Sequence, residues 1–247
     1  MRVKTGIAGL DELMGGGIPA GSSVLVSGKI GTGKSIFAMQ YMAKGITDYG
    51  DFGVFVSLEN SRRELYQHAS EFGWQFQRLE KGGSLQILGG PVSTVNREMK
   101  RARGKVEGLI SEVIETVENS GSKRVAFERV DLLQLLSRKE PDIRMQLSDL
   151  KERLEKLGCT SILTSEIREG KEELSEVGAE EIADGAIVLY YEGEGLTRDR
   201  GLEIVKMRGT EHSNELRFFD ITSKGIVIKK MPEMPRILKA KRGSSPI

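Results

Sequence analysis

Residues 24–37 read VLVSGKIGTGKSIF, and this stretch decides the fold. It contains the pattern G-x-x-x-x-G-K-[ST] at residues 28–35, directly after an apolar run and before a helix-like segment. Glycines in such a turn let backbone N–H groups curl around phosphate oxygens, and the N-terminus of the following helix adds a partial positive charge. The stretch therefore predicts an α/β fold that binds the phosphates of a nucleotide.

Each residue of this loop has an expected part in binding. The Lys34 side chain should reach the β- and γ-phosphates, and the Ser35 hydroxyl should bind Mg²⁺. The backbone that cradles the phosphates is expected to come from the whole loop: Gly28, Lys29, Ile30, Gly31, Thr32, Gly33, Lys34 and Ser35.

Outward from the loop, apolar strands alternate with helical patterns. Strands are predicted at 24–26, 54–56, 85–88, 125–127 and 161–164. Helices are predicted at 36–45, at 104–119 and around the stripe from Ile143 to Leu157. Fully apolar strands in this order are typical of a mostly parallel central sheet with helices on both faces.

The pattern changes after residue 185. Strands are predicted at 186–191, 202–207, 216–221 and 226–228, with short polar turns and no helix-length segment between them. We expect them to form a C-terminal antiparallel extension of the sheet. The sequence thus predicts one domain over residues 1–230, followed by a basic, proline-containing tail at 231–247 that acts as a mobile or partner-dependent arm.

The composition excludes several classes of protein. Lys and Arg number 37 and Asp and Glu 36, so a net charge of +1 provides no general attraction to nucleic acid or to anionic lipid. The single Cys159 cannot form an internal disulfide, and it fits a buried position in a protein of the reducing cytoplasm. We find no signal peptide and no apolar run long enough to span a membrane.

Two acids follow predicted strands at the edge of the sheet where α/β proteins bind ligands. Glu59 ends the run VFVSLE, and Glu128 ends RVAFE. One carboxylate at such a position can orient and deprotonate an attacking water, and the other can hold the water shell of a metal ion. Taken singly, each acid is equally well explained as a solvated residue at a strand end.

Several motifs together resemble the KaiC-like ATPases of the RecA superfamily, and the likeness covers nearly the whole chain. The opening TGIAGLDELMGGGIPAGSSVLVSGKIGTGKS (residues 5–35) is similar to the start of that family. GVFVSLEN (53–60), FGW (72–74), LTSEI (163–167) and AEEIADGAIVL (179–189) resemble later blocks. KMRGTEHS (206–213) is the most family-specific of these stretches.

The resemblance implies a RecA-like P-loop core that assembles head to tail, usually as a hexamer, with ATP and Mg²⁺ between neighbours. It implies Glu59 as the catalytic base and Glu128 at the metal. Lys206 and Arg208 would reach the γ-phosphate held by the adjacent subunit, and His212 would touch its nucleoside. Residues two apart on a strand point to one side, which agrees with a cationic pair aimed at a phosphate. Without the resemblance, an exposed, charged edge strand would explain this pair.

The chain departs from the family pattern at two places. Many relatives carry paired glutamates at the base position, where this chain has Glu59-Asn60. The family's strand usually ends Asp-Ser, and here it ends Glu128-Arg129. Two outcomes stay open for this second departure: the longer Glu128 side chain displaces or shifts a water of the metal shell, or Arg129 pairs with Glu128 and draws it away from the metal. We expect nucleotide binding to survive and hydrolysis to be weakened or abolished.

Three functions from different classes stay open. The first is a slow, oligomeric ATPase that couples its nucleotide state to an unknown protein partner. The second is a nucleotide-gated scaffold without meaningful turnover, like the KaiC-related accessory protein of the archaeal motility motor. The third, a RadA-like recombinase, is disfavoured because the loops expected at 137–142 and 167–178 have mixed charge and no aromatic residue. The basic run at 97–105 is more typical of a solvated face, so nucleic acid is not expected as the primary ligand. No stretch identifies a serine or threonine that accepts phosphate.

Overall fold

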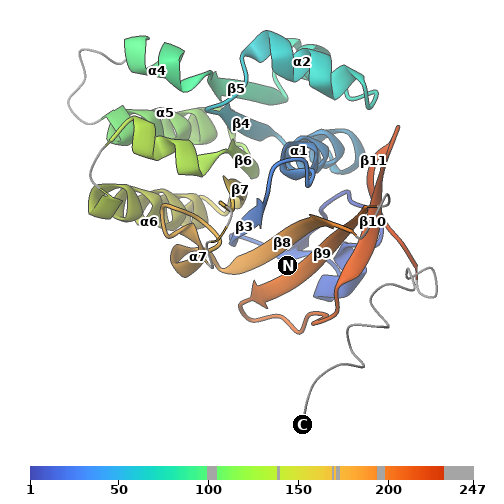
Figure 1. Ribbon diagram of the computed structural model, residues 1–247. Helices are drawn as coiled ribbons and strands as arrows, with labels where there is room; N and C mark the ends of the chain where they lie inside the picture. Colours follow the sequence, from blue (N-terminus) through green and yellow to red (C-terminus); the bar gives the residue numbers. More distant parts are fainter. Residues whose placement is uncertain (99–104, 138–139, 169, 171–172, 194–197, 231–247) are drawn as a thin grey trace.

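The computed structural model describes residues 1–98, 105–137, 140–168, 170, 173–193 and 198–230 (Figure 1). The predicted tail at 231–247 lies outside these residues, as do most of the basic run at 97–105 and parts of the two loops at 137–142 and 167–178. Within the described part, no helix is long and apolar enough to cross a membrane.

The described residues form a nine-stranded sheet in the order β11-β10-β9-β8-β3-β7-β6-β4-β5. The strands from β5 to β8 in this order run parallel. Their bounds are β3 Ser23–Gly28, β4 Gly53–Ser57, β5 Leu85–Gly89, β6 Arg124–Glu128, β7 Thr160–Glu166 and β8 Gly185–Glu192. This confirms the predicted α/β fold with a mostly parallel sheet.

The remaining strands are antiparallel, as the sequence predicts, with one correction. The strands are β9 Asp199–Met207, β10 Arg217–Thr222 and β11 Gly225–Ile228. The segment 186–191 was expected in the antiparallel extension, but β8 pairs parallel with β3 on one side and antiparallel with β9 on the other. The connection 167–184 is long enough for a parallel crossover although its helix α7 spans only Ala179–Ile182. Strand β8 is therefore the boundary between the two halves of the sheet.

Helices cover both faces of the parallel strands (Figure 1). The bounds are α1 Lys34–Tyr49, α2 Arg62–Ser70, α3 Phe76–Lys81, α4 Val92–Glu98, α5 Lys105–Ser120 and α6 Glu140–Lys156. Alternate residues of one strand serve opposite faces: Val125 and Phe127 of β6 pack with the stripes of α5 and α6, whereas Ala126 packs with α1 and α3. Burial on both faces explains why these strands read as unbroken apolar runs.

The N-terminal segment packs against the antiparallel half of the sheet. It contains a two-stranded ribbon, β1 Arg2–Val3 with β2 Ile18–Pro19, and the 3₁₀ helix η1 Asp11–Met14. Asp11 Oδ1 accepts hydrogen bonds from the backbone N–H and the hydroxyl of Thr5 at 2.9 and 2.8 Å, which folds the TGIAGLD turn. Leu10 and Met14 then pack with residues of β9 to β11 in one core cluster.

Arg124 anchors the first residue of β6 to helix α1. Its side chain is 1% exposed, and its Nε lies 2.7 Å from Asp51 Oδ2. Its Nη1 donates to the carbonyl of Lys4 at 2.7 Å, and the guanidinium lies over the Tyr41 ring. Gly45 leaves the space for it, because a Cβ at that position would lie 2.2 Å from Arg124 Nε.

Candidate functional site

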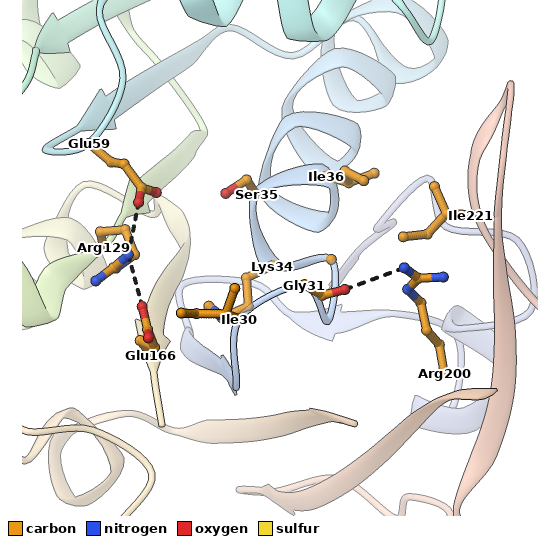
Figure 2. A pocket seen from close by; sticks show the side chains of 11 residues that line it. Ile30, Gly31, Lys34, Ser35, Ile36, Glu59, Arg129, Glu166, Arg200 and Ile221 are labelled. Carbon is orange, nitrogen blue, oxygen red and sulfur yellow. Dashed lines mark hydrogen bonds and ion pairs between the residues drawn. The ribbon is translucent and has the colours of Figure 1, made fainter. Parts of the chain in front are cut away.

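The phosphate loop joins β3 to α1 as the sequence predicts (Figure 2). Gly31 and Gly33 have φ angles of +80° and +106°, a region that favours glycine. At Gly28 a side chain is excluded by space, because a Cβ would lie 2.6 Å from both the Leu189 carbonyl oxygen and Thr32 Oγ1. These constraints explain the glycine spacing of the motif.

Lys34 is the first residue of α1 and is folded back onto its own loop. Its Nζ donates to the carbonyls of Gly28 at 2.7 Å and Lys29 at 2.9 Å. Burial lowers the pKa of this ammonium, and the carboxylate of Glu166 opposes the shift. The ammonium is thus held at the loop by weak, neutral acceptors that an anionic phosphate oxygen can replace.

A cavity of about 300 Å³ opens above the loop. Glu59, Arg129 and Glu166 line it on one side of Lys34 and Ser35, and Arg200 and Ile221 lie on the other (Figure 2). Its remaining walls come from loop and helix residues, namely Ile30, Gly31, Gly33 and Ile36. Five of the eight predicted loop residues therefore meet Glu59 in one cavity, whereas Gly28, Lys29 and Thr32 do not line it.

Glu59 is positioned by a turn that follows β4. The hydroxyl of Ser57 accepts the backbone N–H groups of Glu59 and Asn60 at 3.2 and 2.9 Å. Burial raises the pKa of Glu59, the charges of Glu128 and Asp131 raise it further, and Arg129 opposes them. A carboxyl group whose pKa is raised toward neutrality is a better general base than an ordinary surface acid.

Glu128 ends β6, is fully buried and does not line the cavity. Its Oε2 accepts hydrogen bonds from Ser57 Oγ at 2.6 Å and from Asn60 Nδ2 at 3.1 Å. Its Oε1 is buried without a hydrogen-bond partner among the described residues. The amide of Asn60 donates where a second glutamate would repel Glu128, so the two departures from the family pattern fit each other. The sequence motifs gave no indication of these roles of Asn60 and Ser57.

Of the two alternatives for the Glu128-Arg129 departure, the pairing of Arg129 with Glu128 is wrong. Among the described contacts, Arg129 pairs with Glu59 at 2.9 Å, Asp131 at 2.8 Å and Glu166 at 3.0 Å. Burial disfavours the charged guanidinium, but the hydrogen bonds and charge of Asp131, with the two glutamates, outweigh it and raise the pKa of Arg129. Arg129 therefore acts on the candidate base rather than on the candidate metal ligand.

The backbone at Arg129 is unusual as well. Arg129 has a φ of 64°, and no other described residue apart from glycines has a positive φ. This left-handed conformation links β6 to the 3₁₀ helix η2, Val130–Leu135, and its backbone N–H donates to Thr164 Oγ1 at 2.9 Å. Such strain persists where the surrounding structure imposes it, and it is concentrated at functional sites.

Lys206 and Arg208 lie toward the opposite end of the parallel strands from the phosphate loop. On strand β8, Leu189 pairs with Gly28 of the phosphate loop and Ala186 pairs with Lys206. Lys206 and Gly28 are therefore offset by three residues of β8, or about 10 Å, along the strand direction. Neither cation lines the cavity of its own chain.

The expectation that Lys206 and Arg208 both lie on one strand is wrong for Arg208. Strand β9 ends at Met207, so Arg208 lies beyond it, and a bulge interrupts the pairing near Lys206. Both side chains nevertheless approach the same segment: Lys206 Nζ donates to the Ala183 carbonyl at 2.6 Å, and Arg208 Nη1 lies 3.5 Å from Asp184 Oδ1. The Arg208 side chain stays 57% exposed.

His212 lies in the loop 208–216 between β9 and β10. Its Nδ1 is 3.1 Å from the carbonyl oxygen of Ser213, and the Ser213 backbone N–H donates to the Leu13 carbonyl at 2.9 Å. His212 is not among the residues that line the cavity.

The chain is similar to known proteins in both sequence and structure. The family model for the KaiC ATPase matches residues 3–233. A UPF0273 protein of Methanocaldococcus jannaschii is 36% identical over 92% of this chain and 96% of its own length. The crystal structure of a KaiC-like protein from Pyrococcus horikoshii matches with a TM-score of 0.82 at 36% identity, covering 93% of this chain and 99% of that one. The circadian clock oscillator protein KaiC of Picosynechococcus is 34% identical over 92% of this chain, which spans only 44% of that protein.

Proposed function

The chain belongs to the KaiC ATPase family, and from this premise we propose that it binds Mg·ATP at the phosphate loop and hydrolyses it slowly. We propose further that the nucleotide sites lie at subunit contacts of a ring-shaped homo-oligomer, with a hexamer as the expected form. Nucleotide state would then control the binding of a protein partner.

One observation carries this proposal. The cavity brings the phosphate-loop lysine and serine, Lys34 and Ser35, together with the strand-end acid Glu59. Phosphoryl transfer to water needs this set: a cradle for the phosphates, a metal ligand and a group that accepts a proton from water.

The residues present fit a magnesium ion. The Ser35 hydroxyl faces the cavity, and the unpartnered Oε1 of Glu128 is a buried oxygen acceptor of the kind that a hydrated hard cation requires. When bound, Mg²⁺ neutralises charge on the β- and γ-phosphate oxygens. Ser35 would hold the ion directly, and Glu128, which does not line the cavity, would accept from its water shell only after its carboxylate turns toward the cavity.

The cations at the far end of the parallel strands support a site shared between copies. Lys206 and Arg208 cannot reach the phosphates of their own chain, but an exposed guanidinium at that end can reach the loop of a copy stacked head to tail. In the same arrangement His212 would touch the neighbour's nucleoside.

Slow turnover is supported by the ion pair between Arg129 and Glu59 at 2.9 Å, because this pair must separate before the carboxylate can take a proton from water. The same pair favours the second candidate, a nucleotide-gated scaffold with little or no hydrolysis. Nothing in the described cavity favours a DNA-binding recombinase.

The test is steady-state ATP turnover together with nucleotide binding and sedimentation. Lys34→Ala should remove most nucleotide affinity, because Lys34 is the lysine of the loop that faces the phosphate cavity. A binding constant unchanged in Lys34→Ala contradicts the assigned site, and wild-type binding without turnover selects the scaffold.

The shared site has its own test. Arg208→Ala should lower turnover and leave nucleotide binding by the isolated chain nearly intact. In mixtures with wild type, activity should fall further than simple averaging of the two rates. Averaged activity at every ratio contradicts the action of Arg208 on a neighbouring copy.

A further inference from the structure

The contacts of Arg129 divide its guanidinium into a fixed end and an open end. Asp131 holds the fixed end with three hydrogen bonds from Nε and Nη2, at 2.8 to 3.1 Å, and its side chain is only 5% exposed. The open end is a single nitrogen, Nη1, which Glu59 and Glu166 share at 2.9 and 3.0 Å. These two carboxylates are 42% and 22% exposed.

The open end faces the place where a terminal phosphate belongs. Arg129, Glu59 and Glu166 line the same cavity as Lys34, whose motif assigns it to the β- and γ-phosphates (Figure 2). Guanidinium groups bind phosphate oxygens through short, charge-assisted hydrogen bonds. A phosphate at this position competes with Glu59 for Nη1, and the buried Asp131 contact keeps the guanidinium in place during the exchange.

We propose that Arg129 senses the terminal phosphate: its Nη1 releases Glu59 and binds that phosphate when a nucleoside triphosphate occupies the cavity. This inference rests on the proposed function of the same cavity. In the empty or diphosphate-bound site, Glu59 stays paired with Arg129. The candidate base becomes free to accept a proton only when a phosphate that can be cleaved is present.

Charge supports the exchange. Glu59, Glu166 and Asp131 place three carboxylates around one guanidinium. Releasing one of them leaves Arg129 still paired with two, so the guanidinium is not stranded in a partly buried position. The left-handed backbone at residue 129 fixes the side chain on the cavity wall, which limits the change to the open end.

The experiment measures the affinities of Mg·ADP and of a non-hydrolysable Mg·ATP analogue by titration calorimetry. Arg129→Asn removes the guanidinium and retains a residue that tolerates the left-handed backbone. We expect the preference for the triphosphate over the diphosphate to fall about tenfold, which corresponds to the loss of one charge-assisted hydrogen bond.

Arg129→Lys, whose ammonium makes a single point contact, should lose part of the preference for the triphosphate and serves as the second variant if Arg129→Asn does not fold. The control Arg153→Asn, on an exposed ion pair of α6, should leave both affinities unchanged.

A double-mutant cycle separates exchange from general electrostatics. If Glu59 competes with the phosphate for Nη1, Glu59→Gln should strengthen triphosphate binding and leave diphosphate binding nearly unchanged. In an Arg129→Asn background that gain should disappear. A gain of equal size in both backgrounds, or a triphosphate preference that is the same with and without Arg129, overturns the sensor.

The two proposals fail in different ways. If the wild-type chain binds neither nucleotide, or if Lys34→Ala leaves binding unchanged, the proposed function is wrong and the sensor with it. If binding depends on Lys34 but the preference for triphosphate does not depend on Arg129, only the sensor is wrong.

Discussion

The two ends of strand β6 each carry a largely buried arginine, and they use it in opposite ways. Among the described residues, Arg124 at the start of the strand has one carboxylate partner, Asp51, and is otherwise enclosed by backbone carbonyls and aromatic rings. Arg129 follows the end of the strand, has three carboxylate partners and opens onto a cavity. An arginine whose hydrogen bonds are all made within the folded chain contributes to stability. An arginine that has several carboxylate partners and borders a cavity can exchange one of those partners for a ligand.

The largest effect should come from the candidate base at the Arg129 end. Glu59→Gln retains the shape of the side chain but cannot accept a proton, so turnover should fall roughly 10²- to 10⁴-fold with the nucleotide still bound. Turnover under saturating ATP, with a parallel binding titration, measures this. The unfolding free energy should change little, and an unaltered rate would show that Glu59 is not the base.

A second test addresses the Arg124 end. Arg124→Leu leaves Asp51 without its partner and loses the contacts to Lys4 and Tyr41, so we expect a loss of about 3 kcal/mol in the free energy of unfolding. Urea denaturation measures it. Nucleotide affinity of the folded fraction should match wild type, and a selective loss of affinity would break the division between the two ends.

The smallest effect concerns pH. Burial raises the pKa of Glu59, with Glu128 and Asp131 adding to the shift and Arg129 and Lys34 opposing it. Turnover should therefore fall as pH drops through a value above that of an ordinary glutamate. The effect on stability has the opposite sign, because a carboxyl whose folded pKa is raised stabilises the fold at low pH and loses that contribution as pH rises through the folded pKa. The contribution of Glu59 is the difference in unfolding free energy between wild type and Glu59→Gln, and a difference that favours wild type increasingly as pH rises would contradict this assignment.

The positions of the main strands along the chain and the phosphate loop could be predicted from the sequence because apolar runs and the glycine motif are local signals. The parallel pairing of β8 could not, since the described residues of the crossover before it contain only the short helix α7. The sequence predicted only some of the residues that line the cavity. Glu59 and Lys34 occupy recognisable motif positions, but no sequence motif indicates that Arg129 turns toward Glu59 and Glu166. That direction follows from a left-handed φ at residue 129 and from β4 and β7 lying on either side of β6.

The space that Gly45 leaves for Arg124 has a consequence for protein engineering. Replacing a glycine inside a helix by alanine is a common way to raise thermal stability, because glycine costs about 1 kcal/mol of helix propensity. In helix α1 that substitution would drive a methyl group into the buried guanidinium. Residues 45 and 124 should therefore vary as a pair among related sequences, with alanine tolerated at the helix position only where a smaller side chain begins the strand.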